Sequence, residues 1–144
     1  MLGRDYKGQN CSIARALEIV GERWTLLIIR DVFLGLRRFD EIRDDLGIAR
    51  NVLTDRLARR VEEGILERAP YSERPQRFEY RLTKKGQDLY VALAALRQWG
   101  DQYLANKPSR ELRRKSDKRT VVAALVPEGT VGLRADEVES VPAA

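Results

Sequence analysis

The chain has 144 residues, of which 43% are hydrophobic and 34% charged, and its net charge is +5. This length suits a domain with an ordinary hydrophobic core, and the excess of positive charge favours anionic partners. The absence of histidine and the single cysteine exclude most metal sites, Ser-His and Cys-His nucleophile pairs and any internal disulfide. We therefore expect neither a metal nor another cofactor, and no enzymatic activity.

Membrane and export signals are missing from the sequence. The apolar run at residues 26–29 is cut by Arg30, and no apolar run in the sequence approaches the roughly 20 residues that a membrane span needs. The first twelve residues, MLGRDYKGQNCS, contain no apolar signal core. The sequence predicts a cytoplasmic protein.

Two helices are predicted near the N-terminus. The stretch SIARALEIVG, residues 12–21, has Ser12 as a cap, the apolar residues Ile13, Leu17 and Val20 on one face, and a terminal glycine. The next stretch, ERWTLLIIRDVFLG, residues 22–35, is apolar nearly all round, which is typical of a central buried helix.

Two shorter amphipathic helices follow, separated only by residues 47–49. The first lies in RRFDEIRDDLG, residues 37–47, and has one apolar face made of Phe39, Ile42 and Leu46. The second lies in IARNVLTDRLARRVEEG, residues 48–64, and has apolar residues at four-residue steps, namely Leu53, Leu57 and Val61. Its middle is rich in arginine, and its acidic residues gather at its C-terminal end.

After residue 64 the apolar pattern changes from a helical to an alternating period. The stretches ILERAPY, residues 65–71, and RFEYRL, residues 77–82, predict two strands joined by a polar loop, and hence a hairpin. A long helix then begins near Thr83 and ends before Pro108. Its apolar stripe, which is too long for a small domain to cover alone, consists of Leu89, Leu93, Leu96, Trp99 and Leu104.

These patterns divide the chain into an N-terminal arm (1–10), a main domain (11–104), a basic linker (105–119) and a tail (120–144). In the tail, apolar residues on both sides of the turn at 127–130 predict a small β-hairpin. The expected fold class is α+β and mainly helical, with a long C-terminal dimerisation helix.

The order of short helix, three-residue turn, basic helix and hairpin predicts a helix-turn-helix with a wing. A helix in the DNA major groove needs one apolar face toward its own domain and an opposite face that bonds base edges, with cations toward phosphates. The candidate DNA-binding residues are Arg38, Arg50, Asn51, Thr54, Asp55, Arg56, Arg59, Arg60, Arg74 and Arg77. Two alternatives are an ordinary solvated face and a winged helix that binds only proteins.

The chain resembles the HxlR-type winged-helix transcriptional regulators of bacteria, which are relatives of the MarR group. Three blocks carry the resemblance: CSIARALEIVGERWTLLIIRDVFLGLRRFDEIR, GIARNVLTDRLARRVEEGIL and YRLTKKG, within residues 11–104. The resemblance implies a homodimer on a palindromic operator of double-stranded DNA, with residues 50–63 as the reading helix and residues 65–82 as the wing.

Two positions depart from the resembled family. Ser12 stands where the family often has proline, which matters little because both residues start helices. Ala49 stands where the family often has serine or threonine, so the reading helix lacks a side-chain cap worth about 1 kcal/mol. Either the start of that helix is less rigid or Asn51 compensates.

Aromatic residues and clustered carboxylates raise two further possibilities. Trp24, Tyr90, Trp99 and Tyr103 could line an effector pocket between subunits, although an aromatic core or dimer seam is the simpler interpretation. Carboxylates that could serve an enzyme occur only as exposed-looking helix pairs, at residues 44–45 and 62–63, with no pocket implied.

Cys11, the only thiol, has two interpretations. A cysteine beside a helix start is commonly a small buried hydrophobic residue. Several regulators of the resembled type sense oxidants or electrophiles through a cysteine at this N-terminal position, which makes Cys11 a candidate redox sensor. The positive end of the following helix, with Lys7 and Arg15 nearby, would favour a thiolate if Cys11 is exposed.

Overall fold

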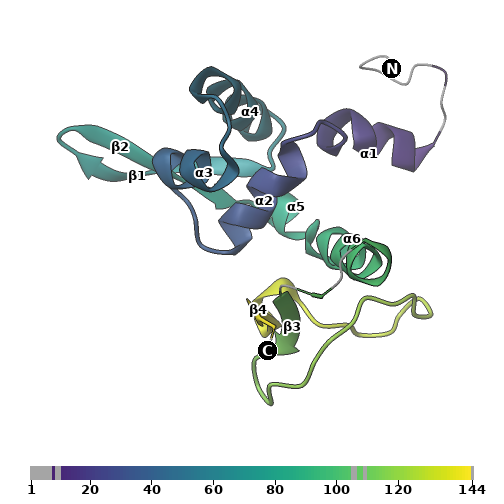
Figure 1. The fold of residues 1–144 in the computed structure, drawn as a ribbon. Helices are drawn as coiled ribbons and strands as arrows, with labels where there is room; N and C mark the ends of the chain where they lie inside the picture. Colours follow the sequence, from purple (N-terminus) through teal and green to yellow (C-terminus); the bar gives the residue numbers. More distant parts are fainter. Residues whose placement is uncertain (1–7, 9–10, 105–106, 109, 144) are drawn as a thin grey trace. The chain divides into compact units, whose positions relative to one another are not determined.

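The computed structural model describes residues 8, 11–104, 107–108 and 110–143 (Figure 1). The chain divides into two compact units, Met1–Gly86 and Gln87–Ala144. Lys7 and nearly all of the predicted N-terminal arm lie outside the described residues. None of the described helices is long and apolar enough to cross a membrane.

The first unit contains the predicted helices and hairpin in the predicted order. The helices are α1 (Ser12–Val20), α2 (Thr25–Phe33), α3 (Phe39–Leu46) and α4 (Arg50–Glu62). The strands β1 (Leu66–Glu73) and β2 (Gln76–Leu82) follow, and the short helix α5 (Lys84–Gln87) comes next. The α+β class with a winged helix-turn-helix is therefore confirmed.

Helix α2 is the centre of the core, as its nearly continuous apolar sequence predicted. Its residues Ile28 and Ile29 are fully buried, and Val32 is 2% exposed. The other buried apolar side chains come from α3, from α4 and from the segments beside them: Ile42, Ile48, Leu53, Leu57, Ile65 and Leu66. Burial of this set fixes how α3 and α4 lie on α2.

The turn between α3 and α4 is as short as predicted. Gly47 ends α3 with a φ of 65°, a left-handed conformation that favours glycine, and its amide donates to the Arg43 carbonyl at 2.9 Å. Buried Ile48 then leads into α4. The turn therefore holds the two helices of the motif in a fixed relation.

The hairpin is attached to the helix-turn-helix through a third extended segment. Strands β1 and β2 are antiparallel, with Leu66 opposite Leu82 and an irregularity between Pro70 and Ser72. The Tyr80 amide donates to the Arg37 carbonyl at 2.7 Å, and Arg38 forms a β-bridge with Glu79. The residues just before α3 therefore extend the hairpin and position the wing.

Helix α1 differs in two ways from the sequence prediction. Ser12 is its first helical residue, so Cys11 occupies the N-cap position, and no side chain caps the helix. No residue of α1 is buried, and the side chains of Ile13 and Leu17 are 72% and 41% exposed. The apolar face of α1 therefore lacks cover within the described chain.

The second unit consists of one long helix and a small sheet. The helix predicted from residue 84 to residue 104 is interrupted, and its main part, α6, runs from Tyr90 to Tyr103. Strand β3 (Arg110–Arg114) pairs antiparallel with β4 (Val138–Pro142), and the 3-10 helix η1 (Ala135–Glu137) precedes β4. Figure 1 shows β3 and β4 side by side.

The tail contains an antiparallel strand pair, but its strands are not the predicted ones. Residues 121–134 form no strand, although the Thr130 amide donates to the Pro127 carbonyl at the predicted turn. Strand β3 lies in the segment 105–119, which the sequence predicted to be a basic linker. Alternating apolar residues indicate strand propensity but not the pairing partner, which depends on tertiary packing.

Candidate nucleic-acid interface

Helix α4 presents opposite faces to the core and to solvent. Leu53 and Leu57 are fully buried against the first unit. The polar residues of α4 that are exposed are Arg50, Asn51, Thr54, Asp55, Arg59 and, at its C-terminal end, Glu62. This is the arrangement that a groove-reading helix requires.

The first turn of α4 has no side-chain cap. Ala49 at the N-cap position supplies no side-chain hydrogen bond, as the sequence predicted. The Thr54 hydroxyl donates to the Arg50 carbonyl at 2.9 Å, so in the free protein its hydrogen is used by the backbone of the same helix. Uncapped amide groups at the start of a helix carry partial positive charge and suit phosphate oxygens.

Asp55 partly neutralises two arginines of the same helix. Its carboxylate lies 2.5 Å from Arg56 Nη1 and 3.4 Å from Arg59 Nε. The Arg59 side chain is 55% exposed, so this ion pair is weak and can be exchanged for a phosphate. Asp55 therefore holds Arg59 only weakly in the free protein.

Arg56 is directed to helix α2 by Glu22, whose role was not predicted from the sequence. The two side chains form an ion pair with an Nε–Oε1 distance of 2.9 Å. This contact raises the pKa of Arg56. Burial alone would raise the pKa of Glu22, but hydrogen bonds from Arg56 and Thr25 lower it below its ordinary value. Arg56 is therefore held inside the motif in this structure.

Arg60 is not on the exposed face that the sequence predicted for it. The residue is 3% exposed, its Nε lies 2.5 Å from Glu63 Oε1, and its guanidinium bonds the buried hydroxyl of Thr25. A phosphate could not reach Arg60 without breaking these contacts. Arg60 stabilises the packing of α4 on α2, and its burial removes it from the candidate DNA contacts.

Aromatic rings support two arginines beside the wing and the reading helix. The Arg38 guanidinium lies over the Tyr71 ring of β1, 4.2 Å from its centroid. The Arg50 guanidinium lies 5.0 Å from the Phe39 centroid. Such cation–π contacts orient a side chain while leaving its charge available. Arg74 and Arg77 are exposed near the tip of the hairpin.

A buried carboxylate in α2 was also not predicted. Asp31 is fully buried, and its Oδ1 accepts hydrogen bonds from Arg30 Nε at 3.1 Å and Nη2 at 2.9 Å. Arg30 also contacts Asp45 of α3 at 3.3 Å. Burial and the neighbouring Asp45 raise the pKa of Asp31 to about 6, although Arg30 acts in the opposite direction.

The four aromatic residues proposed for an effector pocket belong to different units. Trp24 lies in the first unit, and Tyr90, Trp99 and Tyr103 lie in the second. The Trp99 and Tyr103 rings are in tilted contact at 5.4 Å and are 55% and 63% exposed. None of the four lines the cavity that lies beside α6 and β3 in the second unit and has a volume of about 410 Å³.

The structure rejects the interpretation of Cys11 as a buried residue. Cys11 is exposed at the N-cap of α1, and its carbonyl accepts from the Arg15 amide at 3.1 Å. The sensor interpretation is thus sterically open, but no contact in the described residues shows a specific activation of the thiol. Across the described parts of the chain, no group of carboxylates and thiol could hold a metal ion.

Taken together, the three-residue turn, the half-exposed helix α4 and the attached β-hairpin define a winged helix-turn-helix protein. Residues 19–108 match the HxlR-like helix-turn-helix family, and the chain belongs to this family. The class and family expected from the sequence are therefore confirmed.

Known relatives are regulators with the same motif. The HTH-type transcriptional regulator Rv3095 of Mycobacterium tuberculosis is 52% identical over 103 residues, which cover 72% of this chain and 64% of the relative. The chain thus matches less than two thirds of that relative's length.

Two solved structures are similar to the chain. PA1607, described as a candidate transcription factor, has a TM-score of 0.75 and 38% identity, with 85% of this chain and 87% of that chain covered. The reduced form of the transcriptional regulator YodB of Bacillus subtilis has a TM-score of 0.57 and 32% identity, with 67% and 96% covered. YodB has also been solved after diamide treatment.

Proposed function

We propose that this protein is a transcriptional regulator that binds a specific operator in double-stranded DNA as a homodimer. The observation that carries the proposal is the exposed polar face of α4, fixed by buried Leu53 and Leu57 and flanked by the wing arginines. Membership of the HxlR-like family and the regulator relatives support it. We also propose that the protein acts by binding DNA and does not catalyse a reaction.

Within the reading helix, roles follow from exposure and chemistry. Asn51 can bond an adenine edge in two places, and Arg50 can bond guanine in the same manner. Thr54 and Asp55 are also exposed on α4, and we assign them to the surface that faces the bases. Arg59 is the remaining cation of this helix that can reach a phosphate.

The wing and its neighbouring segment supply cations outside the reading helix. Arg74 and Arg77 near the hairpin tip are proposed to contact phosphates of the adjacent minor groove. Arg38, held against Tyr71, is proposed to contact the backbone between the reading helix and the wing. These contacts would position the protein without selecting a sequence.

The proposed dimer rests on apolar side chains that the single chain leaves exposed. Along one face of α6 the exposed fractions are 55% for Leu96 and 55% for Trp99, and Leu104 at the C-cap position is 76% exposed. The exposed side of α1 adds Ile13. Exposed apolar stripes of this length mark contact surfaces in soluble proteins. A two-fold dimer would bind half-sites about 34 Å apart, one helical turn of DNA.

The proposal is tested by gel shift with DNA from upstream of the protein's own gene. We expect a specific complex whose affinity falls steeply with salt, with a slope of about 0.9 per neutralised phosphate. Asn51→Ala should reduce discrimination between operator and mutated operator, by roughly 1–3 kcal/mol per lost bidentate contact. Arg74→Ala is the matched control and should weaken binding to all sequences about equally.

Two results would overturn this assignment. Unchanged operator preference in Asn51→Ala would remove α4 from the role of reader. If the wild-type protein retained no DNA at low salt but captured a protein partner through the same face, the winged helix would be a protein-interaction module.

A regulatory role is proposed for Cys11. The thiol is exposed at the N-cap of α1, a helix whose apolar face is available to a second subunit. Modification of this thiol would alter the contact between subunits and hence the spacing of the two reading helices. The similarity to YodB, solved in reduced and diamide-treated forms, supports an oxidant or electrophile as the effector.

A further inference from the structure

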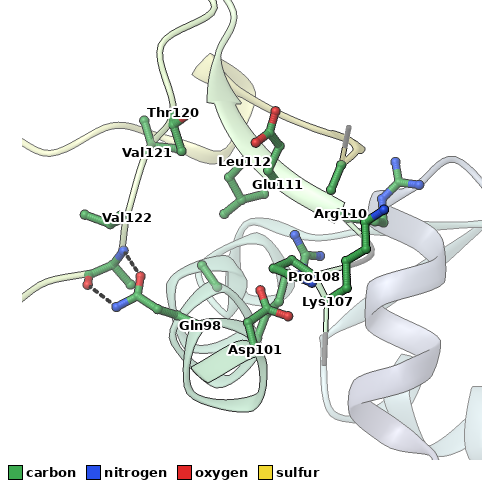
Figure 2. A pocket seen from close by; sticks show the side chains of 14 residues that line it. Gln98, Asp101, Lys107, Pro108, Arg110, Glu111, Leu112, Thr120, Val121 and Val122 are labelled. Atoms are coloured by element: carbon green, nitrogen blue, oxygen red, sulfur yellow. Dashed lines mark hydrogen bonds between the residues drawn. The ribbon is translucent and has the colours of Figure 1, made fainter. Parts of the chain in front are cut away.

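The second unit contains a partly open cavity of about 410 Å³ between α6, strand β3 and the extended segment 120–123 (Figure 2). This volume is within the range of roughly 300–1,000 Å³ that is typical of small-molecule sites. Much of the lining is apolar and comes from Ala94, Pro108, Leu112, Val121, Val122 and Ala123. No residue of α4 or of the wing contributes to the lining.

The segment 120–123 is held in place by hydrogen bonds from both sides. The Gln98 side chain of α6 donates to the Ala123 carbonyl at 3.1 Å and accepts from the Ala123 amide at 3.0 Å, as Figure 2 shows. The Val121 amide donates to the Leu112 carbonyl of β3 at 2.9 Å. The apolar wall is therefore formed before any ligand arrives.

Two cations of the lining converge without a carboxylate between them. Arg110 Nε donates to Ser140 Oγ at 2.8 Å, and Arg97 Nη1 makes a long contact of 3.5 Å with the same oxygen. Arg110 Nη2 also donates to the Ser140 carbonyl. Neither guanidinium forms an ion pair with any carboxylate of the described residues. Both guanidiniums are half-exposed, and an anion placed between them would reduce the repulsion between their like charges.

The neighbouring arginines of β3 are arranged differently. Arg113 Nε binds the Glu111 carboxylate at 2.7 Å, and Arg114 binds Asp117 at 2.5 Å. Local carboxylates therefore neutralise the strand arginines, whereas Arg110 at the cavity is left without one. Arg110 belongs to the same strand as Arg113 and Arg114. The basic composition of this strand therefore does not explain why Arg110 has no carboxylate partner among the described residues.

The remaining charges of the lining leave an excess of positive charge. Glu111 is occupied by Arg113, and Asp101 is the other acid of the lining. Lys107 adds a third cation to Arg97 and Arg110. With the Glu111 charge compensated, the lining carries three cations against one carboxylate, which favours an anionic ligand with a compact charged group.

We propose that this cavity binds a small organic carboxylate with an apolar body. The carboxylate accepts hydrogen bonds from the guanidiniums of Arg97 and Arg110, which both line the cavity. The hydrocarbon part packs on Leu112, Val121 and the neighbouring alanines. The ligand site itself does not depend on DNA binding; its use as an effector site rests on the proposed function.

Titration calorimetry of the full-length protein without DNA tests the site, with octanoate and benzoate as probes. We expect saturable binding of at least one of them and a raised Tm in its presence. Octanol and benzyl alcohol lack the carboxylate charge, and acetate lacks the large hydrocarbon part. Each of these controls should therefore bind at least ten-fold more weakly than the probe that binds. Absence of binding by both carboxylates, or equal binding by the matching alcohol, would overturn the proposal.

Arg97→Gln is the decisive variant because, among the described residues, the hydrogen bond of Arg97 is the long contact with Ser140, whereas Arg110 also bonds the backbone of β4. We expect Arg97→Gln to keep its thermal stability and to lose at least ten-fold in carboxylate affinity. The matched control is Arg134→Gln, an exposed arginine of the same unit that pairs with Asp136 and does not line the cavity. Equal affinity of Arg97→Gln and the control would refute the site, independently of the gel-shift result.

Discussion

Arg56 on the reading helix and Glu22 before α2 form an ion pair, 2.9 Å from Nε to Oε1, that spans the motif. Glu22 also accepts hydrogen bonds from the Trp24 amide at 3.2 Å and the Thr25 hydroxyl at 3.0 Å, so one carboxylate starts α2 and holds α4. Both side chains are less than one third exposed. The pair therefore contributes more to stability than a surface pair.

The coupling between Glu22 and Arg56 can be measured with a double-mutant cycle. Glu22→Gln keeps an acceptor for the Trp24 amide and removes the charge, so it should lower the free energy of unfolding by about 1–2 kcal/mol. Arg56→Gln should cost a similar amount, and the double variant less than the sum by about 1 kcal/mol. Urea denaturation gives these values, with Glu62→Gln on exposed α4 surface as the control. Additive losses would mean that the ion pair is energetically unimportant.

Substitutions of the adjacent residues Arg59 and Arg60 should have different effects. Loss of Arg60 should lower stability, whereas loss of Arg59 should weaken DNA binding. Arg60→Gln removes a buried guanidinium and leaves the Glu63 side chain, which is 25% exposed, without its cation, so it should lower the free energy of unfolding by roughly 1–3 kcal/mol. Arg59→Gln removes an exposed side chain and should leave stability nearly unchanged. In DNA titrations, Arg59→Gln should reduce the salt slope by about one. The reverse pattern would mean that Arg60 leaves its buried contacts to bind DNA.

Asp31 should make stability depend on pH. Its pKa is raised to about 6 from an ordinary 3.8, mainly by burial, so the folded state holds a proton that the unfolded state has lost between these values. The contribution of this group to stability is therefore full below about pH 4 and is lost as the pH rises to about 6. Each pKa unit corresponds to about 1.4 kcal/mol, which limits the loss to about 3 kcal/mol.

Asp31→Asn isolates this effect because asparagine imitates the protonated acid. We expect the variant to gain stability relative to the wild type as the pH rises from 4 to 7, in urea titrations at each pH. The difference between the two proteins cancels the other titrating groups. A difference that does not vary with pH would show that Asp31 is ionised in the folded protein throughout this range.

The apolar stripe of α6 predicts the effect of a single charge on assembly. Leu96 is 55% exposed in the described chain, so Leu96→Asp should leave the fold intact while it shifts sedimentation from dimer to monomer. Gln102→Glu adds a charge at another exposed position of α6 and should leave the dimer unchanged. A wild-type monomer at micromolar concentration would remove the dimer from the proposed function. Leu93, half-buried in the single chain, is a poorer test site because its substitution also disturbs the fold.

The role of Cys11 is tested with diamide and a quinone. Diamide takes two electrons and two protons as two Cys11 thiols join across a dimer, whereas a quinone adds to the thiolate sulfur and takes up its proton. We expect either reagent to reduce operator affinity in the wild type and not in Cys11→Ser. A bridge between subunits requires their Cys11 Cα atoms within about 7 Å, which non-reducing electrophoresis reports as a covalent dimer. Equal responses of wild type and Cys11→Ser would exclude the sensor role.

Local patterns in the sequence were sufficient for most of the first unit. The apolar period of residues 25–33, the glycine at 47 and the alternation of residues 77–82 each select a helix, a turn or a strand through burial over a few residues. The order of these elements then indicated the winged helix-turn-helix and its family. The uncapped start of α4 was also visible, because it depends only on the identity of Ala49.

Tertiary structure decided which charges are available and which strands pair. Arg56, Arg59 and Arg60 are alike in sequence, but only packing on α2 brings Glu22 and Thr25 to two of them and leaves Arg59 exposed. The partner of β3 is a strand more than twenty residues farther along the chain, which no local period can identify. The exposure of Cys11 and the convergence of Arg97 and Arg110 on Ser140 likewise depend on contacts between distant segments. The pattern of apolar residues along a chain determines its helices and strands. Ion-pair partners and cavities form only when those helices and strands pack against one another.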